Sequence, residues 1–216
     1  MPMRMIDLTE ITIHSVSVSE MDNNSYLLTS KRSGEQVLID AADDPTAIQI
    51  MIEAARGESR AGTRVVYVAT THSHWDHVRA LREIVESTGA RTAAGSEDAP
   101  AIDVPTDVLL EHGDTLNVEG FSLEVLHLRG HTPGSIAFLY RDPDGPAHLF
   151  TGDSLFPGGI GNTEKDPERF GMLFTDVVQR VFERLADDTL VHPGHGRSTT
   201  LGIERPDLAA WESRGW

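Results

Sequence analysis

The chain of 216 residues is long enough for one domain with a substantial hydrophobic core, and its apolar content of 39% is typical of a globular protein. Its formal net charge of -16 at pH 7 disfavours a nucleic-acid groove and docking on anionic lipid, because both need basic surfaces. The chain has no cysteine, which excludes disulfides, thiolate nucleophiles and Cys-ligated zinc.

The N-terminal segment carries Arg4, Asp7 and Glu10 and lacks the apolar core of a signal peptide. No apolar run in the chain approaches the length of a membrane span. No repeat, low-complexity tract or linker divides the sequence. We therefore expect a cytoplasmic protein that folds as a single domain over residues 1–216, without a membrane or nucleic-acid partner.

The first forty residues read as strands at 11–18, 25–29 and 36–39, the last of which ends at Asp40. Asp44 and Pro45 then form an N-cap followed by proline at the first helical position, which predicts a helix. Its apolar face would consist of Ile48, Met51, Ile52 and Ala55.

Four side chains that can bind metal follow a buried strand predicted at 64–69. They are His72, His74, Asp76 and His77. Histidines two apart on extended chain point the same way, so His72 and His74 can bind one ion. Asp76 and His77 come at the turn into the next helix, where they would face a second ion. Imidazole and carboxylate together suit zinc, iron or manganese.

The rest of the chain continues the alternation of helices and strands. A helix is predicted after the histidine cluster, ending near Gly89, and strands are predicted at 121–128, 135–140 and 147–150. Asp166 and Pro167 open the clearest helix, whose apolar stripe runs from Phe170 to Leu185. A strand at 189–191 and a short helix at about 206–213 complete the pattern.

Three later motifs each place a potential ligand at a strand-to-loop junction. His131, Asp153 and His195 follow predicted strands, and glycines beside them let the backbone turn sharply near a site. Open sheets place their sites at strand ends, so the three motifs and the histidine cluster together predict one site.

With these motifs the chain resembles the metallo-β-lactamase-fold superfamily from about Ile11 to Thr200. The resemblance implies an α/β fold, an αββα four-layer sandwich with two divalent metal ions at one edge of the paired sheets. It also implies a role for each ligand. The first ion would be held by His72, His74 and His131, and the second by Asp76, His77 and His195, with Asp153 bridging both and Asp40 orienting a ligand.

Two cations about 3.5–4 Å apart lower the pKa of a shared water, so that hydroxide forms near neutral pH and can attack a carbonyl. Asp76 could manage the proton of the attacking water or of the leaving group. Zinc is the expected metal, with iron or manganese as alternatives. Cysteine or serine replaces Asp153 in the β-lactamases of this fold, which disfavours antibiotic hydrolysis.

Within the superfamily the chain is most similar to glyoxalase II-like thioester hydrolases, by His-Trp-Asp-His at 74–77 and Thr-Gly-Asp-Ser-Leu-Phe at 151–156. A small-molecule thioester is therefore the expected substrate, with Trp75, Phe156 and Asn162 near it. The basic residue that anchors glutathione in that family corresponds to the uncharged Asn162. Twenty-one residues follow His195, too few for that family's C-terminal helical domain. These departures leave the thiol carrier open.

Three alternatives remain. A persulfide dioxygenase of this fold would hold one iron with His72, His131 and Asp153. A lactone hydrolase would typically carry tyrosine where this chain has Phe156. A non-catalytic domain could keep the metal for stability alone. The sequence leaves a homo-oligomer open as well. The remaining histidines lack partners at ligand spacing and are interpreted as packing or turn residues: His14, His112, His127, His148 and His192.

Overall fold

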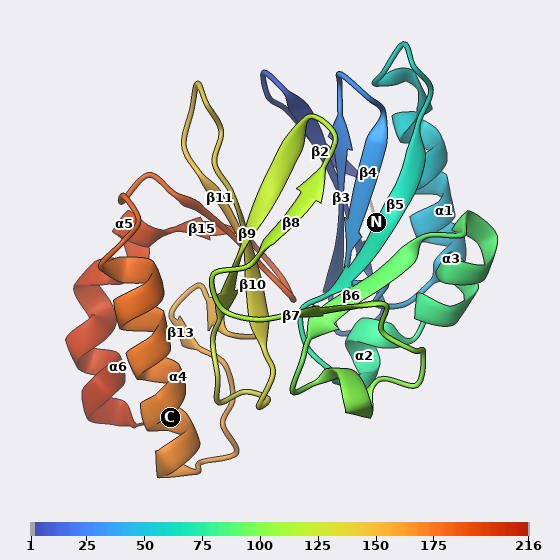
Figure 1. Cartoon of the computed structure of the whole chain (residues 1–216). Helices are drawn as coiled ribbons and strands as arrows, with labels where there is room; N and C mark the ends of the chain where they lie inside the picture. Colours follow the sequence, from blue (N-terminus) through green and yellow to red (C-terminus); the bar gives the residue numbers. More distant parts are fainter. Residues whose placement is uncertain (1–2, 216) are drawn as a thin grey trace.

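The computed structural model describes residues 3–215, in which two mixed β-sheets lie face to face (Figure 1). The first sheet follows chain order. Its strands are β1 (Arg4–Asp7), β2 (Ile11–Val18), β3 (Asn23–Ser30), β4 (Glu35–Ile39), β5 (Arg64–Thr70), β6 (Arg91–Gly95) and β7 (Val108–Leu110). Pairs from β1 to β4 are antiparallel and pairs from β4 to β7 are parallel.

The second sheet has the order β15-β14-β11-β10-β9-β8. Its strands are β8 (Thr115–Val118), β9 (Phe121–His127), β10 (Ile136–Tyr140), β11 (His148–Gly152), β14 (Leu190–Pro193) and β15 (Thr199–Thr200). Only β11 and β14 pair in parallel among them. A small hairpin of β12 (Leu155–Phe156) and β13 (Gly159–Ile160) follows β11.

Helices cover the outer face of each sheet. On the first sheet lie α1 (Pro45–Ala54) and α3 (Leu81–Thr88), and on the second lie α4 (Pro167–Val177) and α6 (Leu208–Arg214), on opposite sides of Figure 1. The short α2 (Trp75–Val78) follows β5, and α5 (Leu201–Glu204) follows β15. The order helix, sheet, sheet, helix confirms the αββα sandwich that the family resemblance implies. No helix within residues 3–215 is long and apolar enough to cross a membrane.

The hydrophobic core between the sheets explains why their strands are apolar. Leu28, Val37, Val125, Phe138 and Phe150 are fully buried in this central cluster. Covered on both faces, central strands such as β10 bury every residue instead of alternating. Two further clusters lie under the helices, so each sheet packs against apolar side chains on both faces.

The helix start and stop signals act as the sequence predicts. The Asp44 carboxylate accepts a hydrogen bond from the Ala47 N–H at 3.1 Å, and Asp166 caps α4 in the same way. Proline occupies the first turn of both helices. Gly89 ends α3 with φ of 69°, a left-handed conformation that glycine adopts without strain.

Two helix predictions need correction. The stripe predicted as one helix to Leu185 ends its α-helical part at Val177, and residues 178–182 form a π-helical turn. The wider turn keeps both Val181 and Phe182 buried against the second sheet. The last helix begins at Leu201 as α5, passes through a 3-10 turn at 205–207 and continues as α6.

Seven strands of the structure are not predicted from the sequence: β1, β6, β7, β8, β12, β13 and β15. The last three are only two residues long. β1, β7 and β8 are three or four residues long and lie at sheet edges, where a periodic pattern has no room to appear. β6 consists of Thr92, two alanines and glycine after Arg91, residues that do not favour strands strongly. β6 forms because it pairs with β5 in the folded sheet, and its own residues do not determine it.

Candidate metal centre

The potential ligands come from strand ends that meet at one edge of the two sheets. His72 lies two residues beyond β5, His131 follows β9, Asp153 follows β11 and His195 follows β14. His74 precedes α2, whose first turn carries Asp76 and His77. The fold thus brings together all seven side chains that the sequence singled out.

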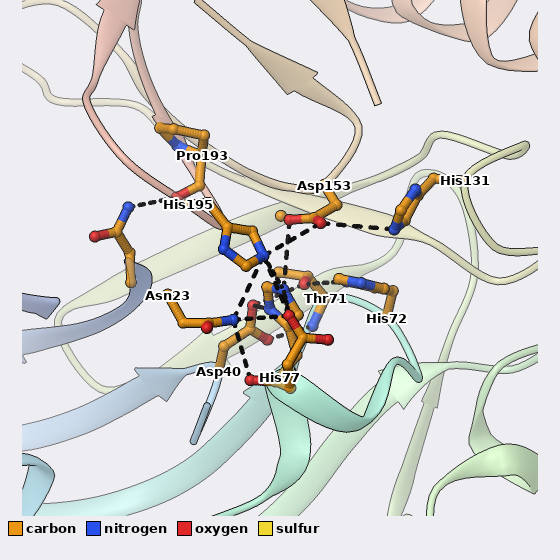
Figure 2. Close-up of polar contacts among 12 residues, drawn as sticks. Asn23, Asp40, Thr71, His72, His77, His131, Asp153, Pro193 and His195 are labelled. Atoms are coloured by element: carbon orange, nitrogen blue, oxygen red, sulfur yellow. Dashed lines mark hydrogen bonds and ion pairs between the residues drawn. The ribbon is translucent and has the colours of Figure 1, made fainter. Parts of the chain in front are cut away.

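Their ligand atoms form three overlapping groups, each within 4.8 Å: His72, His74 and His131; His72, His77 and Asp153; and Asp76, His77 and His195. Asp153 lies between the histidines of both sheets (Figure 2). Its Oδ1 is 3.4 Å from His77 Nε2, and its Oδ2 is 3.4 Å from His195 Nε2 and 3.6 Å from His131 Nε2. One carboxylate therefore faces both the first and the last group.

Three atoms in this centre are buried without a hydrogen-bond partner: His72 Nε2, His131 Nε2 and Asp153 Oδ1. Buried polar atoms are normally satisfied, so such convergence needs an explanation. Imidazole nitrogen and carboxylate oxygen are ligands of divalent transition metals. The residues present therefore fit a bound cation.

Backbone carbonyls orient two of the histidines. His131 Nδ1 donates to the Asn162 carbonyl at 2.8 Å, and His195 Nδ1 donates to the Met21 carbonyl at 2.8 Å. Because a carbonyl only accepts, the hydrogen must lie on Nδ1 in each ring, and the Nε2 lone pair is left facing the centre.

Asp40 orients His77 directly and His72 through Thr71. Its Oδ2 is 2.9 Å from His77 Nδ1 and accepts from the Thr71 hydroxyl at 2.7 Å, while its Oδ1 accepts from the Thr71 N–H at 2.7 Å. The Thr71 oxygen lies 3.0 Å from His72 Nδ1. Asp40 has a φ of 56°, an uncommon conformation for a residue other than glycine, of the kind that gathers at functional sites.

The electrostatics of the centre favour positive charge. Burial lowers the pKa of His72 well below its usual value and also lowers that of His131, so both keep a free lone pair. Burial also acts to lower the pKa of His77, but the carboxylates of Asp153 and Asp40 outweigh it and raise this pKa to about 10. Burial acts to raise the pKa of Asp153, but the imidazoles of His195 and His77, each 3.4 Å away, outweigh it and lower this pKa, which favours the ionised carboxylate. Buried negative charge of this kind is what a divalent cation neutralises.

Helix α4 fixes the turn that carries His131. Arg169 Nε donates to the Gly130 carbonyl at 2.8 Å. The buried Asp176 accepts from Arg129 Nε and Nη2, both at 2.8 Å, and lies 3.2 Å from Arg180. Burial acts to raise the pKa of Asp176, but the hydrogen bonds from Arg129 outweigh it and lower this pKa.

Asp176→Asn should lower the free energy of unfolding by about 2 kcal/mol at pH 7, because it removes a charged, bidentate acceptor. The native pKa lies below the unfolded one of about 3.9, so the contribution is complete above that value and is lost as pH falls. Urea unfolding of both proteins at pH 7 and at about pH 2.5, below the unfolded pKa, should show the difference shrinking at the lower pH. An equal difference at both values would contradict the ion-pair explanation.

The sequence reading missed two residues that contact the loops of the centre. Asp98 is buried, and its carboxylate accepts from the N–H of Ser73 and of Gly134, both at 2.7 Å. Asn23 is also buried and donates to the Asp76 carboxylate at 2.9 Å. Asp98 follows β6, and recognising that strand would have marked it as an acid beyond a strand end. No comparable signal marks Asn23.

The predicted pocket residues lie around the centre in different ways. Trp75 is 57% exposed, with the Arg79 guanidinium 4.7 Å from its ring centre. The Phe156 ring lies 6.4 Å from the His195 ring. Asn162 is exposed, and its Oδ1 accepts from the Glu164 N–H, so its side chain shapes the loop whose carbonyl orients His131.

Two histidines that the sequence analysis interprets as packing or turn residues lie against each other. His148 and His192 stack with ring centres 5.2 Å apart, and His148 Nδ1 is 2.9 Å from His192 Nε2. Both are buried, and burial lowers the pKa of His192 to about 3. They are neutral packing residues behind the turn that carries His195.

Glycine is required at residue 161, where the loop passes the centre. A Cβ there would lie 1.7 Å from the Asp153 carbonyl oxygen and 3.4 Å from His131 Nδ1. Gly161→Ala should therefore displace the loop and weaken metal binding, as measured by zinc titration. Gly171→Ala in α4 is the matched control, since its Cβ meets no atom within 4 Å. It should stabilise the protein by about 0.5–1 kcal/mol through helix propensity. Unchanged zinc affinity in Gly161→Ala would contradict the close approach.

Comparisons with known proteins agree with this geometry. The sequence profile of the metallo-beta-lactamase superfamily matches residues 18–195. Hydroxyacylglutathione hydrolase GloC of Haemophilus influenzae is 33% identical over 153 residues, which cover 62% of this chain and 70% of that protein. The human mitochondrial persulfide dioxygenase ETHE1 is 30% identical over 179 residues, which cover 79% of this chain and 63% of that protein. The chain thus spans about two thirds of the length of these relatives.

A solved structure extends the similarity to three dimensions. TTHA1623 in a di-iron-bound form superposes with a TM-score of 0.70 at 30% identity, covering 88% of this chain and 96% of that chain. The matched profile covers most of the sequence and includes every potential ligand from His72 to His195. The chain therefore belongs to the metallo-beta-lactamase superfamily.

Proposed function

We propose that the chain is a dinuclear metal-dependent hydrolase that cleaves a small-molecule thioester. The observation that carries the proposal is the Asp153 carboxylate, whose two oxygens face histidines of both sheets. The first ion would bind His72, His74 and His131, and the second would bind Asp76, His77 and His195, with Asp153 between them. Zinc is the proposed metal.

Two bound cations would supply Lewis acidity and a lowered pKa for water. The protein's own part is to fix the donors and to move a proton. Asp76 is assigned to proton transfer, because its carboxylate lies inside the centre, with Oδ2 3.2 Å from His195 Nε2, and its other oxygen, Oδ1, would be left to exchange a proton with a water held there. The carbonyl contacts of His131 and His195 keep their protons on Nδ1, away from the reacting groups.

The thioester is supported by the relatives named hydroxyacylglutathione hydrolase, whose matches cover 62% to 89% of this chain at 33% to 34% identity. The thiol carrier is a separate matter. Asn162 is uncharged, and its side chain is engaged with the Glu164 N–H, so it offers no cation to a carboxylate of glutathione. We therefore propose a thioester substrate without assigning glutathione as its carrier.

Metal content per chain, measured by elemental analysis of protein purified without added metal, tests the proposal first. Two ions per chain, as zinc or a mixture, are the expected result. A panel of thioesters, followed by lactones, should then show hydrolysis that a chelator abolishes and added zinc restores. Two ions without hydrolysis of any thioester would contradict the substrate class but not the dinuclear centre.

One observation favours a second candidate, a persulfide dioxygenase with a single iron. The three buried atoms without partners belong to His72, His131 and Asp153, which are the ligands that such an enzyme would use. The similarity to human ETHE1 points the same way. A single iron per chain and oxygen uptake with a thiol persulfide would replace the hydrolase proposal with this one.

A further inference from the structure

The turn between β2 and β3, residues 19–22, runs alongside the turn that carries His195. Asn24 N–H donates to the Gly194 carbonyl at 2.8 Å, and Gly196 N–H donates to the Asp22 carbonyl at 3.0 Å. Asn23 and His195 form an isolated antiparallel bridge between these contacts. The first sheet therefore holds the His195 loop of the second sheet by main-chain hydrogen bonds.

The Asn23 side chain lies inside this junction, beside His77 and His195 (Figure 2). It is fully buried. Its Nδ2 donates to Asp76 Oδ2 at 2.9 Å and to the Asp76 carbonyl at 3.1 Å, which uses both of its N–H groups. The same nitrogen is 3.4 Å from His195 Nε2. One amide thus contacts two of the three residues assigned to the second ion.

Asp76 sets the direction of this amide. Its carboxylate and its carbonyl only accept hydrogen bonds, so the amide nitrogen must face Asp76 and the amide oxygen faces Ser19, whose hydroxyl donates to Asn23 Oδ1 at 2.6 Å. Ser19 and Asp22 both have positive φ, of 64° and 56°. Non-glycine residues keep such conformations where the surrounding contacts hold them, as they do at functional sites.

Asp76 Oδ2 is the oxygen that faces the centre, 3.2 Å from His195 Nε2 and 3.7 Å from His77 Nε2. A carboxylate oxygen can accept one hydrogen bond and still offer a lone pair to a cation. The donor that occupies the first lone pair therefore determines where the second one points. For Asp76 that donor is Asn23.

We propose that Asn23 is a positioning residue for the second metal ion, fixing Asp76 by hydrogen bonds and the His195 turn by strand pairing. The inference rests on the dinuclear centre of the proposed function. In this proposal the β2–β3 turn of the first sheet holds the His195 loop of the second sheet, so that residues of both sheets together form the second metal site. The first site, made by His72, His74 and His131, is independent of Asn23.

Zinc titration against a chromophoric chelator tests this inference, because it gives a dissociation constant for each ion. Asn23→Leu keeps the branched shape of the side chain and removes every hydrogen bond of the amide. It should weaken the second ion by about 10–100-fold, the usual effect of losing a hydrogen bond to a ligand, and leave the first within about twofold. Ser19→Ala removes the donor that holds the amide oxygen and should weaken the second ion by about three- to tenfold.

Ser17→Ala is the matched control, since Ser17, near the end of β2, donates to Asp22 of the same turn and does not contact Asp76. It should leave both constants unchanged. Urea unfolding of the metal-free variants separates metal affinity from stability. Equal weakening of both ions in Asn23→Leu, or unchanged zinc constants in both Asn23→Leu and Ser19→Ala, would overturn the inference.

Failure of the proposed function and failure of this inference give different results. If the wild-type chain binds two zinc ions but cleaves no thioester, the thioester proposal fails and the role of Asn23 stands. If the wild-type chain binds a single ion at the first site, the role proposed for Asn23 is wrong.

Discussion

Replacement of His195 by alanine should leave one ion per chain where the wild type binds two. It should also lower kcat/KM for the thioester at least about a hundredfold. Loss of a residue that hydrogen-bonds to a metal ligand usually costs about 10–100-fold, and loss of the ligand itself should cost more. His195 belongs to the group with Asp76 and His77, and it contacts the first group only through the Asp153 carboxylate. The first ion should therefore remain bound.

His72→Ala is the complementary change and should remove mainly the first ion, because His72 lies with His74 and His131. Native mass spectrometry would count the ions, and zinc titration would identify the weakened site. His112→Ala, an exposed histidine away from the centre, is the control and should keep both ions. If His195→Ala and His72→Ala both retained two ions per chain, the assignment of ligands would be wrong.

The candidate site is largely predictable from sequence because its ligands carry local signals. His72, His74, Asp76 and His77 lie within six residues after an apolar strand, and that spacing alone suggests metal. His131, Asp153 and His195 are single residues in glycine-containing turns. Their convergence on the first four is a property of the fold. Their positions after predicted strands and the resemblance to a family both predict it.

The fold was predictable where elements are long or clearly bounded. Asp44–Pro45 and Asp166–Pro167 mark helix starts whose caps the structure shows. The segment between Gly89 and Phe121 was not predictable, because its strands are short and β6 is built from small residues. Such strands form because β5 and β9 offer them partners, which no local pattern reports.

The residues that hold the loops were missed for the same reason. Asn23 and Asp98 act on partners 53 and 25 or more residues away, and each is a single polar residue in an ordinary segment. Their roles depend on hydrogen bonds between loops, which only the assembled sheets create. Asn23 contacts Asp76 and His195 of the second group, whereas Asp98 contacts the loops of the first.

Asp98→Ala should lower the free energy of unfolding by about 3 kcal/mol, because two buried N–H groups and a hydroxyl lose their acceptor. Asp98 Oδ2 accepts from the Ser73 N–H at 2.7 Å and from the Thr132 hydroxyl at 2.6 Å, and Oδ1 accepts from the Gly134 N–H at 2.7 Å. Ser73 lies between His72 and His74, and Thr132 follows His131. One carboxylate therefore joins the loops that carry all three histidines assigned to the first ion.

The same change should weaken the first ion by about 10–100-fold and the second much less, the reverse of the pattern expected for Asn23→Leu. Urea unfolding of the metal-free protein gives the stability, and zinc titration gives the two constants. Asp103→Ala, an exposed acid in the same loop whose side chain makes no hydrogen bond within residues 3–215, should change neither. Loss of stability without a change in zinc affinity would mean that Asp98 supports the loops but does not position the histidines. If Asp98→Ala weakens mainly the first ion and Asn23→Leu weakens mainly the second, each ion depends on its own contact between loops.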